Sequence, residues 1–431
     1  MLTKSEKSLA HSEVRLSRRR QWAAGQAISF LMQQAVENPH VISLAAGLVD
    51  SSSLPIDETR DVLRTVLDDQ VLAQQALQYG TTQGSERLRK EVGRLLGRYE
   101  GLSNRAIDPG QIVLTTGSQQ LLSLVGEVLL DPGDICLVAA PTYFVFLSVL
   151  SGLGARAIPV DADDQGMRVD LLEEQLARLA AAGELPRVKL IYVVSYYENP
   201  SGISLSEERR QRVVEIARRW SKDQRIFVLE DAAYRDLRYD GPVHPSVWSF
   251  DAERETVILA QTFSKSFSPG LRVGFGVVPD SLVRPICDRK GNEDFGSAHF
   301  NQRIMTAVLE SGRYESHVEL VRASYRTKRD RMLAAAERYF HDLPGVSWVR
   351  PEGGIYVWMT LPPGVETGFD SALFKRATKV DGVMYVPGEL SYAGPLEERR
   401  RSQMRLSFGV ETPDRIEEGI RRLAAAVRAV L

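Results

Sequence analysis

The stretch Gln261–Gly274, QTFSKSFSPGLRVG, carries the residue types best suited to chemistry. Lys265 follows an apolar run and lies among hydroxyl side chains, and Arg272 comes seven residues later. Burial and a neighbouring cation lower the pKa of a lysine amine, which makes it a nucleophile and a base. The hydroxyls of Thr262 and Ser264, together with the guanidinium of Arg272, suit a phosphate dianion. An amine beside a phosphate site is what a pyridoxal 5′-phosphate Schiff base requires.

Other polar residues follow the ends of apolar runs and have a structural as well as a chemical interpretation. Gly117-Ser118-Gln119 fits a helix N-cap, and the free amides at a helix N-terminus also bind phosphate. Asn199-Pro200-Ser201-Gly202, taken alone, is a turn. Asp231 ends a buried run, where a carboxylate needs a partner. Arg405 lies between apolar neighbours, and such an arginine is more often one half of a surface salt bridge.

Length and composition limit the class of protein. At 431 residues the chain exceeds the roughly 250–300 at which a single core stops growing, which predicts two domains or one large domain with an appendage. An apolar fraction of 43% and a charged fraction of 26% exclude disordered, collagen-like and disulfide-scaffold classes. Cys136 and Cys287 encode neither a disulfide framework nor a zinc site, so we expect no metal and two free thiols.

Charge and hydropathy indicate a soluble cytoplasmic protein. With 54 basic and 56 acidic side chains, the net charge of −2 gives no overall attraction for nucleic acid or anionic lipid. No apolar run approaches the roughly 20 residues that cross a bilayer, and the N-terminus lacks the apolar core of a secretory signal. We expect Ser17–Arg20 to be a solvated face and expect neither a membrane nor a nucleic-acid partner.

Short apolar runs alternate with helical stretches through the first 280 residues. Seven strands are expected, over residues 112–116, 135–140, 155–160, 188–194, 225–231, 256–262 and 273–279. Amphipathic stretches such as Leu205–Trp220 lie between them. This alternation predicts an α/β domain with a mainly parallel seven-stranded sheet sandwiched by helices. Runs such as LIYVV lack two-residue alternation, as expected for strands buried on both sides.

After residue 300 the pattern changes to that of a smaller α+β domain. One long helix is expected over residues 301–340, then strands within 346–350, 353–361 and 404–409, and a terminal helix over 415–431. We expect an N-terminal arm over 1–50, a large cofactor-binding domain over 51–310 and a small domain over 311–431. The arm is expected to pack on the small domain or on a partner subunit.

Seven short motifs occur in an order that resembles one known family. They are QYG (78–80), GSQ (117–119), PTY (141–143), NPSG (199–202), EDAAY (230–234), TFSKSFSPGLRVG (262–274) and MRLSF (404–408). The chain resembles class I/II aminotransferases of the pyridoxal-phosphate fold type I, from about Val41 to its C-terminus. Within them it is similar to the branch that contains 2-aminoadipate and kynurenine aminotransferases and the MocR effector domains.

The resemblance implies a set of cofactor contacts. Lys265 is expected to form the Schiff base and to act as general base and acid, with Asp231 pairing the pyridinium nitrogen and Tyr143 stacking on the ring. Asn199 and Tyr234 are expected to hydrogen-bond the phenolic oxygen. The phosphate is expected to contact Ser118, Gln119, Thr262, Ser264, Arg272 and, from the neighbouring subunit, Tyr79. The last contact implies a homodimer with a shared active site.

The resemblance also implies substrate contacts and shows departures near them. Arg405 is expected to bind the substrate α-carboxylate, beside Asn199 and the loop of Gly47. In that loop, Ala45–Asp50 keeps the second glycine of the usual Gly-Gly-Leu-Pro turn but loses its proline.

Three further positions depart from the family pattern. Ser195 replaces a proline, Ser391 stands where an aromatic is common, and Ile28–Phe30 lacks an arginine that some members use for a second carboxylate. A dicarboxylate such as 2-aminoadipate is therefore disfavoured.

The resulting hypothesis is an aminotransferase that moves an amino group between an L-2-amino acid and a 2-oxo acid by a ping-pong mechanism, with Lys265, Asp231 and Tyr234 as its catalytic residues. A decarboxylase, lyase or synthase on the same scaffold is the alternative, because one fold serves several bond cleavages. A ligand-sensing regulator is a remote alternative, since the 40 residues before Val41 leave no room for a winged helix.

Overall fold

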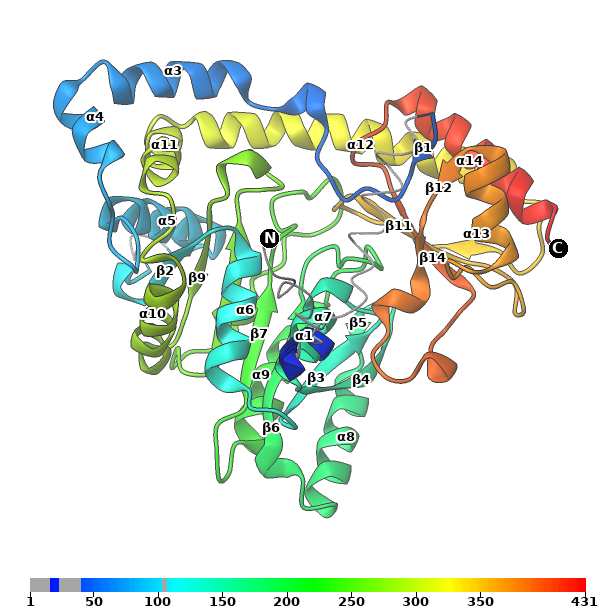
Figure 1. Cartoon of the computed structure of the whole chain (residues 1–431), viewed down its shortest axis with the longest axis horizontal. Helices are drawn as coiled ribbons and strands as arrows, with labels where there is room; N and C mark the ends of the chain where they lie inside the picture. Colours follow the sequence, from blue (N-terminus) through cyan, green and yellow to red (C-terminus); the bar gives the residue numbers. More distant parts are fainter. Residues whose placement is uncertain (1–15, 23–39, 103–106) are drawn as a thin grey trace, which may run out of the picture.

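The computed structural model of the protein describes residues 16–22, 40–102 and 107–431 (Figure 1). Its centre is an eight-stranded sheet in the order β2-β9-β8-β7-β6-β3-β4-β5. The strands are β2 (Ile112–Thr115), β3 (Ile135–Ala140), β4 (Arg156–Asp163), β5 (Gly166–Met167), β6 (Val188–Val194), β7 (Phe227–Asp231), β8 (Val257–Thr262) and β9 (Gly274–Val277). The seven expected strands all form, and two-residue β5 adds an eighth at one edge.

The sheet is mainly parallel, as predicted. Strands β8, β7, β6, β3 and β4 run in one direction, and β9 is antiparallel to both of its neighbours, β2 and β8. Strand β2 therefore points the same way as the parallel strands. The segments that follow β2, β3, β6, β7 and β8 consequently emerge at one edge of the sheet, which is where polar side chains from distant parts of the sequence can meet.

Helices cover both faces of this sheet because its strands carry apolar side chains on both sides. On β2, Val113 packs into one apolar layer while Ile112 and Leu114 pack into the other. The helices of the first layer are α6 (Ser118–Leu129), α7 (Phe144–Leu153) and α10 (Asp280–Asp294), and those of the second are α5 (Glu86–Tyr99), α8 (Val169–Ala181) and α9 (Glu207–Trp220). This arrangement explains the continuous apolar runs in the sequence.

The single helix expected over residues 301–340 is wrong: two helices form, α11 (His299–Glu310) and α12 (Arg313–Phe340). Gly312, with φ of +70°, ends the first and begins the second, because this left-handed backbone conformation cannot continue an α-helix. The 28 residues of α12 span about 42 Å and run along the top of the molecule toward a second sheet (Figure 1). Two further helices, α3 (Ile56–Leu67) and α4 (Gln70–Leu77), lie beside α11.

The second sheet is antiparallel, in the order β10-β11-β14-β13. Its strands are β10 (Ser347–Trp348), β11 (Tyr356–Thr360), β13 (Val386–Pro387) and β14 (Gln403–Ser407), and α13 (Ala372–Arg376) and α14 (Pro413–Arg428) complete this region. Helix α14 packs on α12. Strands β10 and β11 lie within the expected ranges, β14 begins one residue before its expected range, and β13 was not expected. Short 3-10 turns occupy Ser51–Ser53, Pro109–Gln111, Leu185–Arg187, Val247–Phe250, Pro269–Leu271, Gly388–Ser391 and Leu396–Glu398, and a π turn occupies Ala377–Asp381.

The described parts of the expected N-terminal arm contact two regions. In α1 (Arg18–Trp22), the Trp22 carbonyl accepts a hydrogen bond from the Ser151 hydroxyl of α7 at 3.0 Å. Strand β1 (Ile42–Ser43) pairs in parallel with β12 (Val383–Met384). Residues 1–15 and 23–39 of the arm lie outside the described residues.

Two expectations about the whole chain can be compared with the structure. Cys136 and Cys287 are both free, as predicted. Within residues 16–22, 40–102 and 107–431, no helix has the length and apolar character needed to cross a bilayer.

Candidate active site

A cavity of about 270 Å³ opens at the edge of the sheet where the parallel strands end. Its lining contains ten of the residues expected to contact the cofactor: Ser118, Gln119, Tyr143, Asn199, Asp231, Tyr234, Thr262, Ser264, Lys265 and Arg272. The loops after β2, β3, β6, β7 and β8 each contribute to it. Parallel strands thus bring together residues that lie more than 150 positions apart in the sequence.

Lys265 follows β8, and its side chain reaches the loop of Gly47 that precedes α3. Its amine donates a hydrogen bond to the Gly47 carbonyl at 2.7 Å. Burial lowers the pKa of this amine, and Arg405 and Arg272 lower it further while Tyr356 opposes them. A larger fraction of the amine is therefore unprotonated at neutral pH than for an exposed lysine, as nucleophilic attack requires.

The opposite end of the cavity has the donors of a phosphate site. Helix α6 begins at Ser118 and presents free backbone amides there. Gly117 has φ of +75°, and a Cβ at Gly274 would lie 2.6 Å from the Ser118 nitrogen, so glycine at 274 keeps β9 close to this helix end. Arg272, also left-handed with φ of +50°, donates to the Thr116 carbonyl at 3.2 Å.

Two hydroxyls complete this end of the cavity. Thr262 donates to the Ser264 hydroxyl at 2.9 Å, and both side chains are buried. Amides, hydroxyls and a guanidinium around one hollow match the chemistry of a phosphate dianion. The donor set therefore fits the phosphate of pyridoxal 5′-phosphate.

Asp231, at the end of β7, is a buried carboxylate without a cationic partner among the described residues. It accepts hydrogen bonds from the Tyr192 hydroxyl at 2.9 Å and from the Ala233 amide at 3.1 Å. Burial raises its pKa from 3.8 to about 6, and the hydrogen bond from Tyr192 opposes this rise. A pyridinium N–H would supply the missing positive charge, so this residue also fits the cofactor. The sequence analysis did not identify Tyr192, which occupies an apolar strand like any core tyrosine.

The expected substrate side of the site lies where the two sheets meet. Arg405, on β14, is buried and donates to the Asn199 side-chain oxygen at 2.8 Å and to the Ala45 carbonyl at 2.7 Å. Its Nε is buried with no hydrogen-bond partner in the described structure. The guanidinium lies over the ring of Tyr356 at 4.3 Å from its centroid. Arg405 is thus held as a buried cation beside the cavity rather than in a surface salt bridge.

Tyr356 is a residue that the sequence analysis missed. It lies on β11, and its hydroxyl is 3.1 Å from the hydroxyl of Tyr234. The strand was expected, but every residue from Ile355 to Met359 is apolar or aromatic, so nothing in the sequence distinguishes the one that faces the site.

Tyr79 is the expected cofactor residue that does not line the cavity in the described chain. Its side chain is 88% exposed, and it does not line the 270 Å³ hollow. This placement is compatible with its expected role toward a neighbouring subunit.

The described positions that depart from the family pattern do not line the cavity. Asp50 forms a buried ion pair with Lys328 at 3.0 Å, which ties the loop of Gly47 to α12. The Ser391 carbonyl accepts a hydrogen bond from the Thr142 amide at 2.8 Å. Ile28–Phe30 lies outside the described residues.

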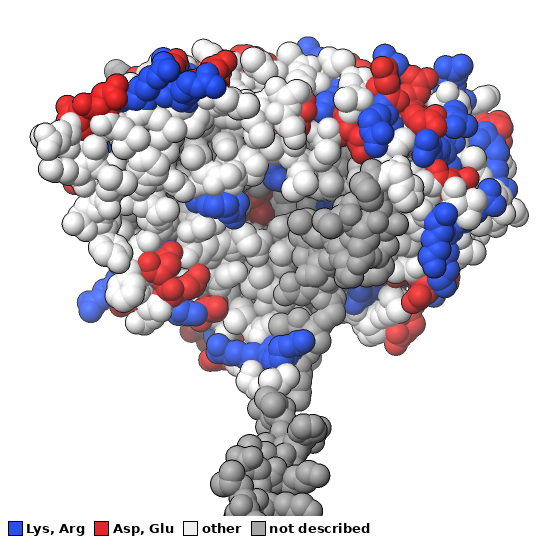
Figure 2. All heavy atoms as spheres, turned by 45° about the horizontal axis from the view of Figure 1, so that its top comes forward, with Lys and Arg blue, Asp and Glu red and all other residues white. Residues whose placement is uncertain are grey.

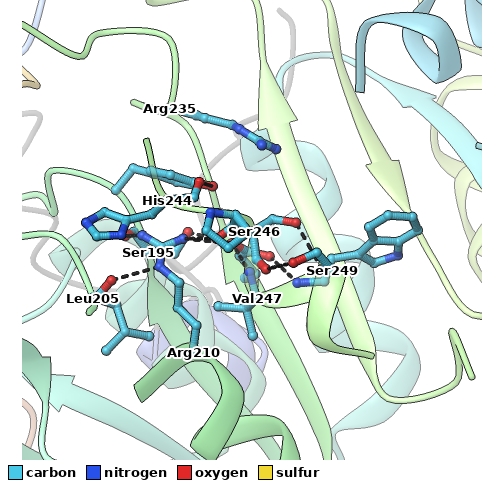
Figure 3. Close-up of polar contacts among 12 residues, drawn as sticks. Ser195, Leu205, Arg210, Arg235, His244, Ser246, Val247 and Ser249 are labelled. Atoms are coloured by element: carbon cyan, nitrogen blue, oxygen red, sulfur yellow. Dashed lines mark hydrogen bonds and ion pairs between the residues drawn. The ribbon is translucent and has the colours of Figure 1, made fainter. Parts of the chain in front are cut away.

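Ser195 belongs to a buried polar network behind β7 (Figure 3). Its hydroxyl donates to Glu230 at 2.7 Å, and Glu230 also accepts from the amides of Val247 and Trp248, each at 2.9 Å. Arg210 donates to the Ser195 carbonyl and, at 2.7 Å, to that of Leu205 (Figure 3). Glu230 immediately precedes Asp231, so this network fixes the end of β7 from the side opposite the cavity.

Comparison with known proteins identifies the family. The model of the family described as aminotransferase class I and II matches residues 39–423. Aromatic-amino-acid aminotransferase 1 of Thermococcus litoralis is 36% identical over 394 residues, which cover 91% of this chain and 89% of that protein.

Two solved structures are similar over nearly their whole length. The multiple substrate aminotransferase of Thermococcus profundus gives a TM-score of 0.86 at 34% identity, covering 96% of this chain and 97% of its own. The α-aminoadipate aminotransferase of Thermus thermophilus, in complex with N-(5′-phosphopyridoxyl)-L-leucine, gives a TM-score of 0.83 at 30% identity. The match covers 96% of this chain and 97% of that one. Because the family match extends from residue 39 into the last helix and the fold is shared throughout, the chain belongs to the class I and II aminotransferases, and it is an amino acid transaminase that uses pyridoxal 5′-phosphate.

Proposed function

We propose that the protein moves an amino group between an L-2-amino acid and a 2-oxo acid by a ping-pong mechanism, at the cavity around Lys265. The observation that carries this proposal is the convergence on one cavity of an amine with a lowered pKa and a buried carboxylate without a cation, next to a buried arginine. Transamination needs the amine for the exchange of amino groups and the carboxylate to pair with the ring nitrogen of the cofactor. It needs the arginine to bind the substrate carboxylate.

Each residue has one role in this proposal. When bound, pyridoxal 5′-phosphate supplies an aldehyde and a ring that accepts the electrons released at the substrate α-carbon. Lys265 removes the proton from the substrate α-carbon and delivers it to carbon C4′ of the cofactor, and in the second half-reaction it moves a proton in the opposite direction. Asp231 holds the proton of the ring nitrogen, and Asn199 and Tyr234 donate toward the phenolic oxygen. Arg405 orients the α-carboxylate.

The charges around the cavity support an uncharged substrate side chain. Among the described residues, Lys265 and Arg272 are the cations in the cavity lining, and Arg405 lies beside it. All three have roles already, so none is left for a second carboxylate. We therefore propose that dicarboxylates such as 2-aminoadipate are poor substrates.

A homodimer with a shared active site is part of the proposal. Residues 70–84, which include α4, carry no charged side chain, and within them Val71, Leu77 and Tyr79 are 62%, 71% and 88% exposed. A groove of about 640 Å³ beside them is lined mainly by residues of α3. In Figure 2, few charged atoms lie directly below the cluster of charged side chains at the upper left. An uncharged surface with exposed apolar side chains favours burial against a second copy, in which Tyr79 would reach the phosphate.

We also propose the division into an arm (1–50), a large domain (51–310) and a small domain (311–431), and a cytoplasmic location. The larger sheet lies wholly within 51–310, and the four-stranded sheet lies wholly within 311–431. Two free thiols and the absence of a membrane-spanning helix in the described ranges are compatible with the location.

The visible absorption spectrum, recorded with L-amino acids but no oxo acid, tests the reaction. Conversion of the yellow band to the pyridoxamine form by uncharged amino acids, and not by 2-aminoadipate, is the expected result. A yellow band that no amino acid converts would instead support the decarboxylase, lyase or synthase alternative.

A single variant tests the assignment of the lysine. Lys265→Ala should lose the borohydride-reducible link to the cofactor completely, because its amine is the proposed point of attachment. If the link persisted in this variant, the assignment of Lys265 would be wrong.

A further inference from the structure

Tyr234 and Tyr356 form a hydroxyl pair that joins the two sheets at the cavity. Tyr234 follows β7 of the large sheet, Tyr356 lies on β11 of the small one, and their oxygens are 3.1 Å apart. Their rings meet edge to face, with centroids 5.7 Å apart at 75°. Tyr356 is 2% exposed and Tyr234 6% exposed. A buried hydroxyl needs a hydrogen-bond partner, and this pair supplies it from opposite sheets.

The direction of this hydrogen bond follows from the partners of each hydroxyl. In the described structure Tyr356 has no hydrogen-bond partner other than Tyr234. Tyr234 lines the cavity, where its proton is proposed to face the phenolic oxygen of the cofactor. Burial holds the pKa of Tyr234 well above its usual value, so this hydroxyl stays protonated. With the Tyr234 proton directed at that oxygen, the Tyr356 hydroxyl is the one left to donate to Tyr234.

Gly47 makes room for the Tyr356 hydroxyl. A Cβ at position 47 would lie 2.6 Å from the Tyr356 oxygen, and the next nearest atom of the same side chain would be 3.7 Å away. The clash therefore involves the hydroxyl alone. The Gly47 carbonyl accepts from Lys265, so the same residue contacts two parts of the site.

The ring of Tyr356 has a separate contact with the substrate side. Trp358 pairs with Arg405 across β11 and β14, and Tyr356 lies two residues before Trp358, on the same face of the sheet. The Arg405 guanidinium lies 4.3 Å from the centroid of the Tyr356 ring. Loss of the hydroxyl would leave this contact in place.

We propose that Tyr356 is a positioning residue that donates a hydrogen bond to Tyr234 and thereby keeps Tyr234 a donor toward the cofactor's phenolic oxygen, and that position 47 is glycine to accommodate its hydroxyl. This inference rests on the proposed role of Tyr234. A hydroxyl group donates a stronger hydrogen bond when its own oxygen accepts one from a neighbour.

The pH at which the visible band of the bound cofactor changes, its spectroscopic midpoint, tests the inference. A hydrogen bond to the phenolic oxygen favours the deprotonated form of the bound cofactor, so weakening the donor raises the midpoint. We expect Tyr356→Phe to raise it by about half a pH unit, within what one hydrogen bond supplies. Tyr234→Phe should raise it more, and adding Tyr356→Phe to that variant should change nothing further.

A matched control separates this effect from the general loss of a buried hydroxyl. Tyr385 is fully buried and donates to the Thr367 carbonyl at 3.0 Å, in the small-sheet region. Tyr385→Phe removes one buried hydrogen bond in the same way and should leave the midpoint unchanged. If Tyr385→Phe shifted the spectroscopic midpoint as much as Tyr356→Phe does, the inference would be overturned.

The steric part has its own test, by rescue. Gly47→Ala should displace the Tyr356 hydroxyl and raise the midpoint to a similar value. Gly47→Ala combined with Tyr356→Phe should then match Tyr356→Phe alone, since the clashing oxygen is gone and the nearest contact becomes ordinary. If the midpoint of the double variant differed from the wild-type value by more than that of either single variant, the steric part of the inference would be contradicted.

The failure of this inference differs from failure of the proposed function. If Tyr234→Phe moves the midpoint and Tyr356→Phe does not, the inference is wrong and the role of Tyr234 stands. If Tyr234→Phe itself leaves the midpoint unchanged, the proposed role of Tyr234 fails and the inference fails with it.

Discussion

Replacement of Asp231 by asparagine should stabilise the cofactor-free protein. The carboxylate is buried and accepts hydrogen bonds from the Tyr192 hydroxyl and the Ala233 amide. Asparagine has the same shape; its oxygen can accept from Ala233, and its amide can donate to the Tyr192 oxygen. The substitution therefore removes a buried charge while retaining both hydrogen bonds.

The magnitude follows from the pKa of Asp231. Burial raises this pKa from 3.8 to about 6, and each pH unit corresponds to ~1.4 kcal/mol. Below pH 4 the carboxyl is protonated in both folded and unfolded protein. Between pH 4 and 6 the folded protein holds a proton that the unfolded chain has lost, so its stability falls as pH rises. At pH 7.5 the ionised carboxylate therefore costs the cofactor-free fold about 3 kcal/mol.

Thermal unfolding of the cofactor-free proteins at several pH values measures this cost. At pH 7.5, Asp231→Asn should unfold at a higher temperature than the wild type, and the difference should shrink to nothing near pH 4. With pyridoxal 5′-phosphate added, this difference in unfolding temperature should largely disappear, since only the carboxylate pairs with the pyridinium. The variant should bind the cofactor up to about 100-fold more weakly, which is the cost of about 3 kcal/mol converted to a ratio of dissociation constants.

A second buried aspartate provides the control. Asp251 is fully buried but is paired with Arg218 at 2.5 Å and accepts from the Thr256 and Val257 amides. Asp251→Asn breaks an existing ion pair and should lower the unfolding temperature. If cofactor-free Asp231→Asn were no more stable than the wild type at pH 7.5, the account of Asp231 as an unpaired buried charge would be refuted.

Two further substitutions test the ends of the cavity. Arg405→Ala should raise the dissociation constant of the amino acid substrate about 30- to 150-fold, because a bidentate charged contact is worth about 2–3 kcal/mol; spectral titration measures it, and a change below about threefold would contradict the role. Gly274→Ala should weaken cofactor binding at least about tenfold in an absorbance titration, since its Cβ would lie 2.6 Å from the Ser118 nitrogen and the strand would have to move. Gly270→Ala, whose Cβ would have its nearest contact at 3.8 Å, is the control and should bind normally.

The large sheet could be predicted from the sequence because its strands are buried on both faces. Runs such as Val188–Val194 are apolar throughout, which distinguishes them from the amphipathic helices between them. The break between α11 and α12 was less evident. Gly312 lies in a charged, helix-favouring stretch where a single glycine is tolerated, so its left-handed conformation was not evident from the sequence.

Most of the cavity could be predicted because its residues follow strands that end at one edge. Ten of the expected cofactor residues line it. Tyr356 could not be found in this way, because its position depends on the pairing of β11 with β14 and on how the two sheets approach each other. Neither relation has a local signal in the sequence. Tyr192 was missed for a similar reason, since its hydroxyl meets Asp231 across neighbouring strands.

The loop that carries Ala45 and Gly47 has a consequence for turnover. The Ala45 carbonyl accepts a hydrogen bond from Arg405, which also donates to Asn199, and the Gly47 carbonyl accepts one from Lys265. Both cations thus have neutral resting partners on one segment, and a departing product does not leave either of them unsolvated and unpaired. At Arg405, substrate binding is accordingly an exchange of partners, in which the incoming carboxylate replaces the Ala45 carbonyl. The loop thereby lowers the difference in energy between the empty and the occupied site, which favours rapid release over tight retention.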